Sequence, residues 1–424
     1  MKKQYFIHLF ALVLAFLYGA LLVLWLQESA GLHWMLDTIW GVKGVYIPGQ
    51  WYARAPLPFF DLAGTLSWRE CYLRGFDVMA HNPCDPLQRP SNYSPLWYLL
   101  PTGGIKTAIP LGLLMDAVFI AALPLALAPR SWCEFWVALA ATLSPVVVFA
   151  VERANVDVLM FVMMLAALWL WRHNREWMAL AAILAAGALK FYPLAMLIIF
   201  ASALYRRLLM FCAVALVSVT IFVACFWSEL MRIPGLMPPP IYFGDNFGAA
   251  LVALAARDEL GLPPFVTPLL RYALTAASLL AGWRLSMRWP PLNPPAEHSA
   301  LMLAGSAIMA FCFLSSTNVG YRAIFLLALL PGVIALRSAN SRLSNWGIAA
   351  IMFCLYAEPL RLGSRALELL IYGSDPNMLS QELPEVAYFL LHEGFWWFLV
   401  VLMLAIQFAW LRQLPRGNQR AIKA

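Results

Sequence analysis

Residues 5–27 read YFIHLFALVLAFLYGALLVLWLQ, an apolar run long enough to cross a bilayer as a helix. Lys2 and Lys3 precede this run and no small-residue cleavage site follows it, so it is predicted to stay in the protein as its first helix. The rest of the chain is similar: 62% of its residues are hydrophobic, 12% are charged, and the mean hydropathy is +0.74. A soluble fold cannot bury so much apolar surface.

Apolar segments recur along the chain with short polar breaks, and we predict an all-α integral membrane protein, a polytopic bundle forming one domain over residues 1–424. About twelve spans are expected, at 5–27, 109–128, 132–151, 156–171, 177–189, 193–205, 208–227, 265–283, 299–314, 323–336, 343–356 and 395–411. Residues 28–107 would form a large first loop, in which 61–76 has the pattern of an amphipathic helix lying at the membrane interface.

The distribution of basic residues predicts the orientation. With a cytoplasmic N-terminus, the cytoplasmic segments carry 15 basic and three acidic residues, and they include a C-terminal tail at 412–424. The first loop is then extracytoplasmic, and both termini are cytoplasmic. The net charge of +7 follows from this orientation and indicates no nucleic-acid partner.

Two predicted spans, 177–189 and 193–205, are too short to cross the membrane alone, since each covers about 20 Å of a core about 30 Å thick. Their junction, Lys190-Phe191-Tyr192-Pro193, is expected to lie below the outer surface. Interrupted helices at membrane depth occur where they line a cavity or are buried in protein. We therefore expect a cavity that opens outward.

Ionisable residues near the outer face are the candidate site, because charge at membrane depth is costly and commonly functional. They form four groups: the loop from Asp61 to Trp97, residues 152–157 (ERANVD), the Lys190 junction, and 318–322 (NVGYR). The predicted topology brings loop carboxylates to one face with the cations Arg153, Lys190 and Arg322. Such groups suit transfer of a sugar from a lipid phosphate, in which a carboxylate takes the acceptor proton and cations stabilise the leaving phosphate.

Three sequence elements carry a resemblance to a known family. They are Asp61 followed by Gly75-Phe76-Asp77-Val78 and Tyr93-Ser94-Pro95-Leu96-Trp97, then Glu152-Arg153-Ala154-Asn155-Val156-Asp157, then Lys190-Phe191-Tyr192-Pro193. In this order they resemble the GT-C class of polyprenyl-phosphate-sugar glycosyltransferases, in particular glycosyltransferase family 87, over about the first half of the chain. The chain departs from the family pattern at Ser94, where YPP is expected, and at Ala154, where RGN is expected.

The resemblance implies a GT-C-like fold and a multi-pass protein of the bacterial inner membrane with an extracytoplasmic active site. It implies inverting transfer of mannose or a related sugar from a polyprenyl-phosphate donor to a glycan or glycolipid acceptor, with membrane lipids as surroundings and no metal or other cofactor. Asp61 would be the general base, and Arg153, Lys190, Tyr192 and Arg322 would bind the donor phosphate. The remaining candidates are Tyr93, Asp77, Asp85, Asn155, Asp157 and Tyr321.

Local roles compete with these assignments. Asp61 is alternatively the N-cap of a helix starting at Leu62, and Asn155 is alternatively a cap of the span that follows it. Asp77 and Asp85 lie in turn-like sequence, where Asp is common for local hydrogen bonding. Arg153, four residues before Asp157, is alternatively its ion-pair partner.

The third and fourth groups also have alternatives without a ligand. Lys190 would snorkel from a helix end to interfacial water, and Tyr192 would anchor in the interfacial aromatic belt. Arg322, next to Tyr321, would pair with an outer carboxylate. For the whole protein, the alternative functions are a transporter or flippase of a lipid-linked sugar, and a non-catalytic envelope subunit.

The seven cysteines provide one further expectation. Cys71 and Cys84 share the first loop, in a compartment that permits oxidation, so they either form a disulfide or remain as thiols. No common metal-binding spacing occurs in the sequence.

Overall fold

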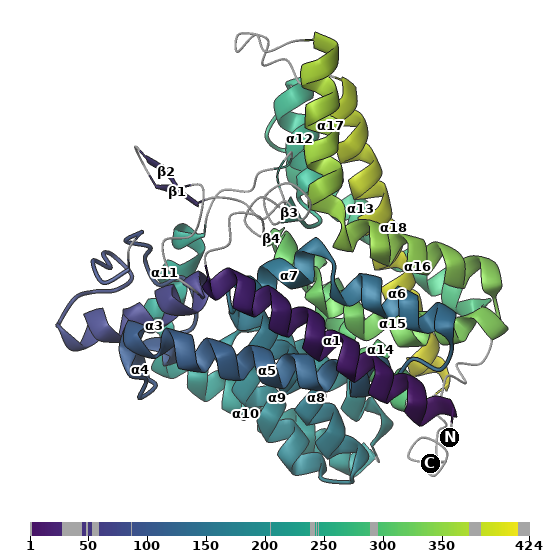
Figure 1. Ribbon diagram of the computed structural model, residues 1–424, viewed down its shortest axis with the longest axis horizontal. Helices are drawn as coiled ribbons and strands as arrows, with labels where there is room; N and C mark the ends of the chain where they lie inside the picture. The colour runs from purple at the N-terminus through teal and green to yellow at the C-terminus, as the bar shows by residue number, and fades with distance from the viewer. Residues whose placement is uncertain are drawn as a thin grey trace.

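The computed structural model describes residues 2–27, 45–47, 50–52, 59–85, 87–203, 205–237, 242, 244, 246–288, 296–372 and 383–413. Much of the predicted first loop, at 28–44 and 53–58, and most of the predicted tail, at 414–424, therefore lie outside the described residues. The described part is almost entirely helical, with two short two-stranded ladders (Figure 1).

The first half of the chain contains α1 (Lys2–Leu26), β1 (Val45–Ile47), β2 (Gln50–Tyr52), α3 (Phe60–Leu73), α4 (Leu96–Leu99), η1 (Gly104–Thr107), α5 (Ala108–Leu127), α6 (Trp132–Thr142), α7 (Pro145–Glu152), α8 (Val156–Arg172), α9 (Glu176–Leu189), η2 (Tyr192–Ser202) and α10 (Tyr205–Cys225). The second half contains α11 (Trp227–Leu236), β3 (Asn246–Phe247), α12 (Leu251–Leu260), α13 (Val266–Met287), α14 (Ala296–Ser315), β4 (Asn318–Val319), η3 (Gly320–Phe325), α15 (Leu326–Ala335), η4 (Leu336–Ser338), α16 (Ser341–Leu355), α17 (Ala357–Tyr372) and α18 (Leu383–Gln413). Strands β1 and β2 pair antiparallel, as do β3 and β4.

The helices include several that fit a membrane. Within the part of the chain that the structure describes, six helical segments are long and apolar enough to cross a membrane, or seven if the bent pair α6 and α7 counts as one span. Among the described residues, α9 and η2 are apolar but short, as the sequence predicts. The protein is thus all-α with helices suited to a bilayer, while the number of twelve spans stays a prediction.

The predicted span 132–151 is not one continuous helix. It is broken between α6 and α7, whose axes differ by 49°. Pro145 is the first residue of α7, where its missing N–H is tolerated, and Ser144 before it has extended backbone. The break sets the direction of α7, which ends at Glu152, next to the turn whose Arg153 carbonyl oxygen accepts hydrogen bonds from α3.

The centre of the bundle is formed by α14 and α15, which are the most enclosed of the candidate spans. Small residues let these two helices approach closely. A Cβ atom on Gly305 would lie 2.7 Å from the Cβ of Ala328, and one on Gly332 would lie 2.4 Å from the sulfur of Met302. By contrast, only 17% of the residues in the apolar stretch of α1 are buried, so α1 presents most of its surface outward.

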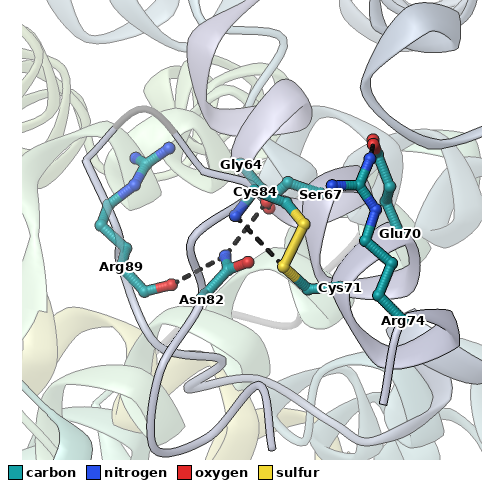
Figure 2. The surroundings of a disulfide bond; sticks show 8 residues. All are labelled: Gly64, Ser67, Glu70, Cys71, Arg74, Asn82, Cys84 and Arg89. Atoms are coloured by element: carbon teal, nitrogen blue, oxygen red, sulfur yellow. Dashed lines mark hydrogen bonds and ion pairs between the residues drawn. A yellow bond between two sulfur atoms is a disulfide. The ribbon is translucent and has the colours of Figure 1, made fainter. Parts of the chain in front are cut away.

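The segment after α3 is tied back onto that helix. Cys71 and Cys84 form a disulfide, which decides between the two states considered for them (Figure 2). The Asn82 side chain donates hydrogen bonds to Ser67 Oγ at 3.1 Å and to the carbonyl oxygen of Arg89 at 3.0 Å. These bonds fix the turn from which the Arg89 side chain extends.

Candidate functional site

Asp61 lies in the first turn of α3 and contacts the turn between α7 and α8. Its Oδ2 accepts a hydrogen bond from Asn155 Nδ2 at 2.7 Å, and its Oδ1 lies 3.5 Å from Arg89 Nη1 and 3.7 Å from Arg153 Nη1. The backbone N–H groups of Asp61 and Leu62 both point to the carbonyl oxygen of Arg153, at 3.2 and 3.4 Å. The carboxylate is therefore held on one side by an amide, while Oδ1 keeps capacity for another donor.

Asp61 does not cap its helix. Helix α3 begins at Phe60, and the capping position is Phe59, which has left-handed backbone with φ of 53° and no side-chain cap. The N-cap interpretation of Asp61 and the helix start at Leu62 are wrong, because the chain enters the helix two residues earlier. The predicted amphipathic helix does exist, but most of its residues are buried in the protein.

A cavity of about 520 Å³ lies in front of Asp61. Three charged residues line it, namely Asp61, Arg89 and Arg153, together with Tyr93 and Tyr321. Burial raises the pKa of the Tyr93 phenol, and the negative charges of Asp157 and Asp61 raise it further. The Tyr93 hydroxyl is therefore protonated at neutral pH and available as a hydrogen-bond donor.

A second carboxylate, Asp157 on α8, forms a closed cluster beside this cavity. Lys190 Nζ and the Tyr192 hydroxyl both donate to its Oδ1, the latter at 2.6 Å, and Arg322 Nε donates to its Oδ2 at 3.3 Å. Arg322 also donates to Asn318 Oδ1. The Asp157 side chain is fully buried, so its charge is matched within the protein.

The Asp157 cluster corrects several local interpretations. Asp157 pairs with Lys190 and Arg322, so the predicted ion pair between Arg153 and Asp157 is wrong. Helix α8 starts only after Arg153, and the Arg153 side chain pairs with Asp61 instead. Lys190 does not snorkel, since its side chain is 5% exposed. Tyr192 is likewise buried and bound to Asp157 rather than placed in an interfacial belt.

Arg322 pairs with a carboxylate, as one alternative supposed, and that carboxylate is the buried Asp157 of α8. Asn155 caps α8 as predicted, because its side chain accepts from the N–H of Asp157 at 3.0 Å. The same side chain donates to Asp61. Asn155 therefore links the carboxylate of Asp61 to the first turn of α8, at the backbone of Asp157.

Tyr93 also connects the two parts. It lines the cavity with Asp61, and Lys190 Nζ lies 4.5 Å from the centre of its ring. Four residues were predicted to bind the donor phosphate. Arg153 lines this cavity, whereas Lys190, Tyr192 and Arg322 are not among its lining residues. Sequence elements 30 to 260 residues from Asp61 thus converge on one place, as the sequence predicts.

Arg89 is a site residue that the sequence analysis missed. Its guanidinium donates to both oxygens of Asp85, at 2.7 and 3.0 Å, and stacks over the Phe60 ring at 4.2 Å. It is 34% exposed, more than Arg153 at 8%. The spacing of Asp85 and Arg89, four residues apart in the loop after Cys84, was the available signal.

Asp85 and Asp77 occupy turns, as the local alternative predicts. Asp85 is buried, accepts from the N–H of Arg89 at 2.9 Å, and so reaches Asp61 only through Arg89. Asp77 accepts from the N–H of Met79 and pairs with Arg232 at 2.8 Å. The Arg232 hydrogen bond lowers the pKa of Asp77, which is half-exposed and does not line the cavity.

Within the described residues, no group of three or more His, Cys, Asp and Glu is placed to hold a metal ion. In comparisons with known proteins, no family model matches the chain, and neither a curated protein nor a solved structure matches it.

Proposed function

We propose that the protein transfers mannose or a related sugar, with inversion, from a polyprenyl-phosphate donor to a hydroxyl of an envelope glycan or glycolipid. The reaction would take place on the extracytoplasmic face of a bacterial inner membrane. The observation that carries the proposal is the Asp61 carboxylate, which faces a cavity of about 520 Å³ beside two guanidinium groups. The resemblance to GT-C glycosyltransferases is a second support.

The proposed step is a direct displacement. Asp61 accepts the proton of the acceptor hydroxyl, whose oxygen forms a bond to the anomeric carbon of the sugar. The bond from that carbon to the phosphate oxygen breaks, and the electron pair leaves with the polyprenyl phosphate. Oδ1 is the oxygen suited to the proton, since Oδ2 already accepts from Asn155 at 2.7 Å.

Arg89 and Arg153 are the cations best placed for the phosphate, because both line the cavity. Guanidinium groups bind phosphate oxygens in charge-assisted, bidentate pairs. Tyr93 and Tyr321 can add hydroxyl donors from the same wall. Lys190, Tyr192 and Arg322 would act as positioning residues, since their polar groups bind Asp157 and thereby hold the start of α8, which carries Asn155.

The proposal is tested by measuring transfer from a synthetic polyprenyl-phosphate mannose by the purified protein in liposomes. Asp61→Asn is expected to lower kcat by about 10²- to 10⁴-fold, the usual contribution of a general base. An amide at this position can still accept from Asn155, so the melting temperature should not change. Asp77→Asn is the matched control, because it removes an exposed carboxylate of the same loop that does not line the cavity.

Full turnover by Asp61→Asn would remove Asp61 from the base role and contradict the proposed mechanism. Movement of intact donor lipid between leaflets by wild type, without any transfer, would favour the carrier function instead. That measurement requires only a labelled donor and a membrane-impermeant quencher.

A further inference from the structure

A second cavity is lined by Phe59 and Glu152, which neighbour residues that line the first. Its volume is about 510 Å³, and it is enclosed by α1, α5 and α7. On α1 its lining runs from Ala11 to Trp25, which corresponds to about 21 Å of helix. Its walls are mostly apolar. Helices α1 and α5 are among the least buried candidate spans, with 17% and 39% of the residues in their apolar stretches buried. We call this space the α1–α5 groove.

Asp116 of α5 is the unusual residue of the α1–α5 groove. It is 6% exposed, and its Oδ1 is buried without a hydrogen-bond partner among the described residues. The neighbouring Tyr18 hydroxyl is used elsewhere, since it donates to the carbonyl oxygen of Thr142 at 2.5 Å. A carboxyl group inside an apolar helix is costly, and when one of its oxygens has no partner, a ligand that supplies a donor is the expected explanation.

The charge of the groove selects among lipids. Among the described residues, two with carboxyl groups line it, Asp116 and Glu152, and no Lys, Arg or His does. Glu152 Oε2 accepts from Arg153 Nε at 3.2 Å, so the adjacent cation is directed to Glu152. A phosphate group would find no cation among these lining residues, whereas a hydroxyl group would find carboxyl oxygens that can accept its hydrogen bond.

The groove and the Asp61 cavity are neighbours. Phe59 lines the groove and Asp61 the cavity, and in the facing segment Glu152 lines the groove and Arg153 the cavity. The two segments are joined by the backbone hydrogen bond from Asp61 to Arg153. A chain lying in the groove therefore ends next to the proposed base.

We infer that the α1–α5 groove binds an uncharged, hydroxyl-bearing lipid and, on the premise of the proposed function, that this lipid is the acceptor. Its chain lies between α1 and α5, a hydroxyl donates to Asp116 Oδ1, and the head group extends past Phe59 to Asp61. The donor phosphate is not expected in the groove, because no Lys, Arg or His is among the described residues that line it. The acceptor is thus lipid-anchored and not a water-soluble glycan.

Binding is tested with two photoactivatable lipids that share the same chains, a diacylglycerol with a free hydroxyl and a phosphatidic acid with a phosphate in its place. Each is incorporated with the full chain into nanodiscs, and labelled peptides are identified by mass spectrometry. Diacylglycerol is expected to label α1 and α5 at least about fivefold more than phosphatidic acid, the effect of about 1 kcal/mol of differential interaction. Equal labelling by the two lipids would overturn the inference.

Variants locate the labelling. Gly19 lines the groove, and a Cβ atom added at this position would have no other atom within 4 Å. Gly19→Leu therefore places a side chain in the groove and should lower diacylglycerol labelling about tenfold. Gly394→Leu on α18 is the matched control, because Gly394 is equally open and does not line the groove. Asp116→Leu should lower labelling about fivefold and Asp116→Asn should preserve it. Unchanged labelling in Gly19→Leu would overturn the inference even if the Asp116 variants fail to fold.

Transfer assays separate this inference from the proposed function. If diacylglycerol labels the groove but no acceptor receives sugar, the lipid site stands and its role as acceptor site is overturned along with the proposed function. If sugar is transferred to a soluble glycan and Gly19→Leu transfers as fast as Gly394→Leu, the proposed function stands and the lipid-anchored acceptor is overturned. Transfer to a hydroxyl-bearing lipid that Gly19→Leu abolishes supports both.

Discussion

The two carboxylates of the site, Asp61 and Asp157, differ in how they are satisfied, although Asn155 binds both the Asp61 side chain and the Asp157 backbone. Asp157 is fully buried and accepts from three side chains. Asp61 is 18% exposed, accepts one short hydrogen bond, and faces a cavity. A saturated ion cluster holds structure, whereas a carboxylate with an unused acceptor beside a cavity can exchange a proton with a ligand.

Substitutions that remove the same charge are expected to have different effects at Asp157 and at Asp61. In the Asp157 cluster, a lost charge leaves its partner buried and uncompensated. Around Asp61, water in the cavity can replace a lost partner. Stability should therefore respond to the first cluster, and substrate turnover to the second.

The largest stability effect is expected for Asp157→Asn and for Lys190→Met. Asp157→Asn leaves the cations Lys190 and Arg322 without their carboxylate and should lower the free energy of unfolding by about 3–5 kcal/mol. Lys190→Met leaves Asp157 with Arg322 as its cation and should lie toward the lower end of this range. The measurement is denaturant unfolding in detergent. The double variant should recover part of the loss, because it removes the charges of Asp157 and Lys190 together, while Arg322 keeps its charge. A double variant as unstable as the sum of the singles would contradict this account of the cluster.

Removal of the Cys71–Cys84 disulfide by the double Ser variant should cost about 2–4 kcal/mol, since the bond closes a loop of about 13 residues. This change loosens the turn that carries Arg89, on the Asp61 side only. Thermal unfolding under oxidising and reducing conditions measures it. Wild type should lose stability on reduction and the double Ser variant should not; an equal response of both would contradict the prediction.

Arg89→Gln sharpens the comparison at the cavity. It removes one guanidinium that faces the cavity, and KM for the polyprenyl-phosphate donor should rise about 10- to 100-fold, the cost of one charged hydrogen-bonded contact. Arg89→Lys should recover only part of this loss, because Lys cannot bind phosphate in a bidentate manner. Arg232→Gln is the control cation, since its partner Asp77 lies outside the cavity. A normal donor KM in Arg89→Gln would exclude a phosphate contact.

The smallest effect is expected for Asp77→Asn. Its pair with Arg232 is exposed, so the loss should stay below about 1 kcal/mol and decrease with added salt. Because the pKa of Asp77 is lowered from 3.8, the pair stabilises the protein above that pH, and the contribution disappears as the pH falls through the lowered pKa. Unfolding at pH 7 and below pH 3 measures it; a loss as large as that of Asp157→Asn would remove the distinction between exposed and buried pairs.

The helical membrane character was predictable because it depends on composition and on the length of apolar runs. The convergence of Asp61, 152–157, Lys190 and 318–322 was also predictable, since all were expected at one face of the membrane. The break between α6 and α7 was not recognised, although Ser144-Pro145 marks it in the sequence. Arg89 was missed because its importance depends on the turn that Asn82 and the disulfide fix.

Pairing within the site followed packing and not spacing. Arg153 and Asp157 have the separation of a helical ion pair, yet Arg153 precedes the start of α8 and turns to Asp61. Lys190, 33 residues from Asp157, is its partner instead. A spacing of four predicts a pair within one helix. Outside a helix the local fold decides, and it pairs Asp85 with Arg89 but not Arg153 with Asp157.

The sequence alone determined that this chain forms apolar helices, with polar residues gathered at one end of them, because hydropathy and periodicity are properties of each segment taken separately. Only the tertiary structure decided which carboxylate is saturated by cations and which faces a cavity, and that Asp116 faces an apolar groove. The physical reason is that hydrogen bonding and burial depend on the relative placement of helices, which is set by packing across the whole bundle.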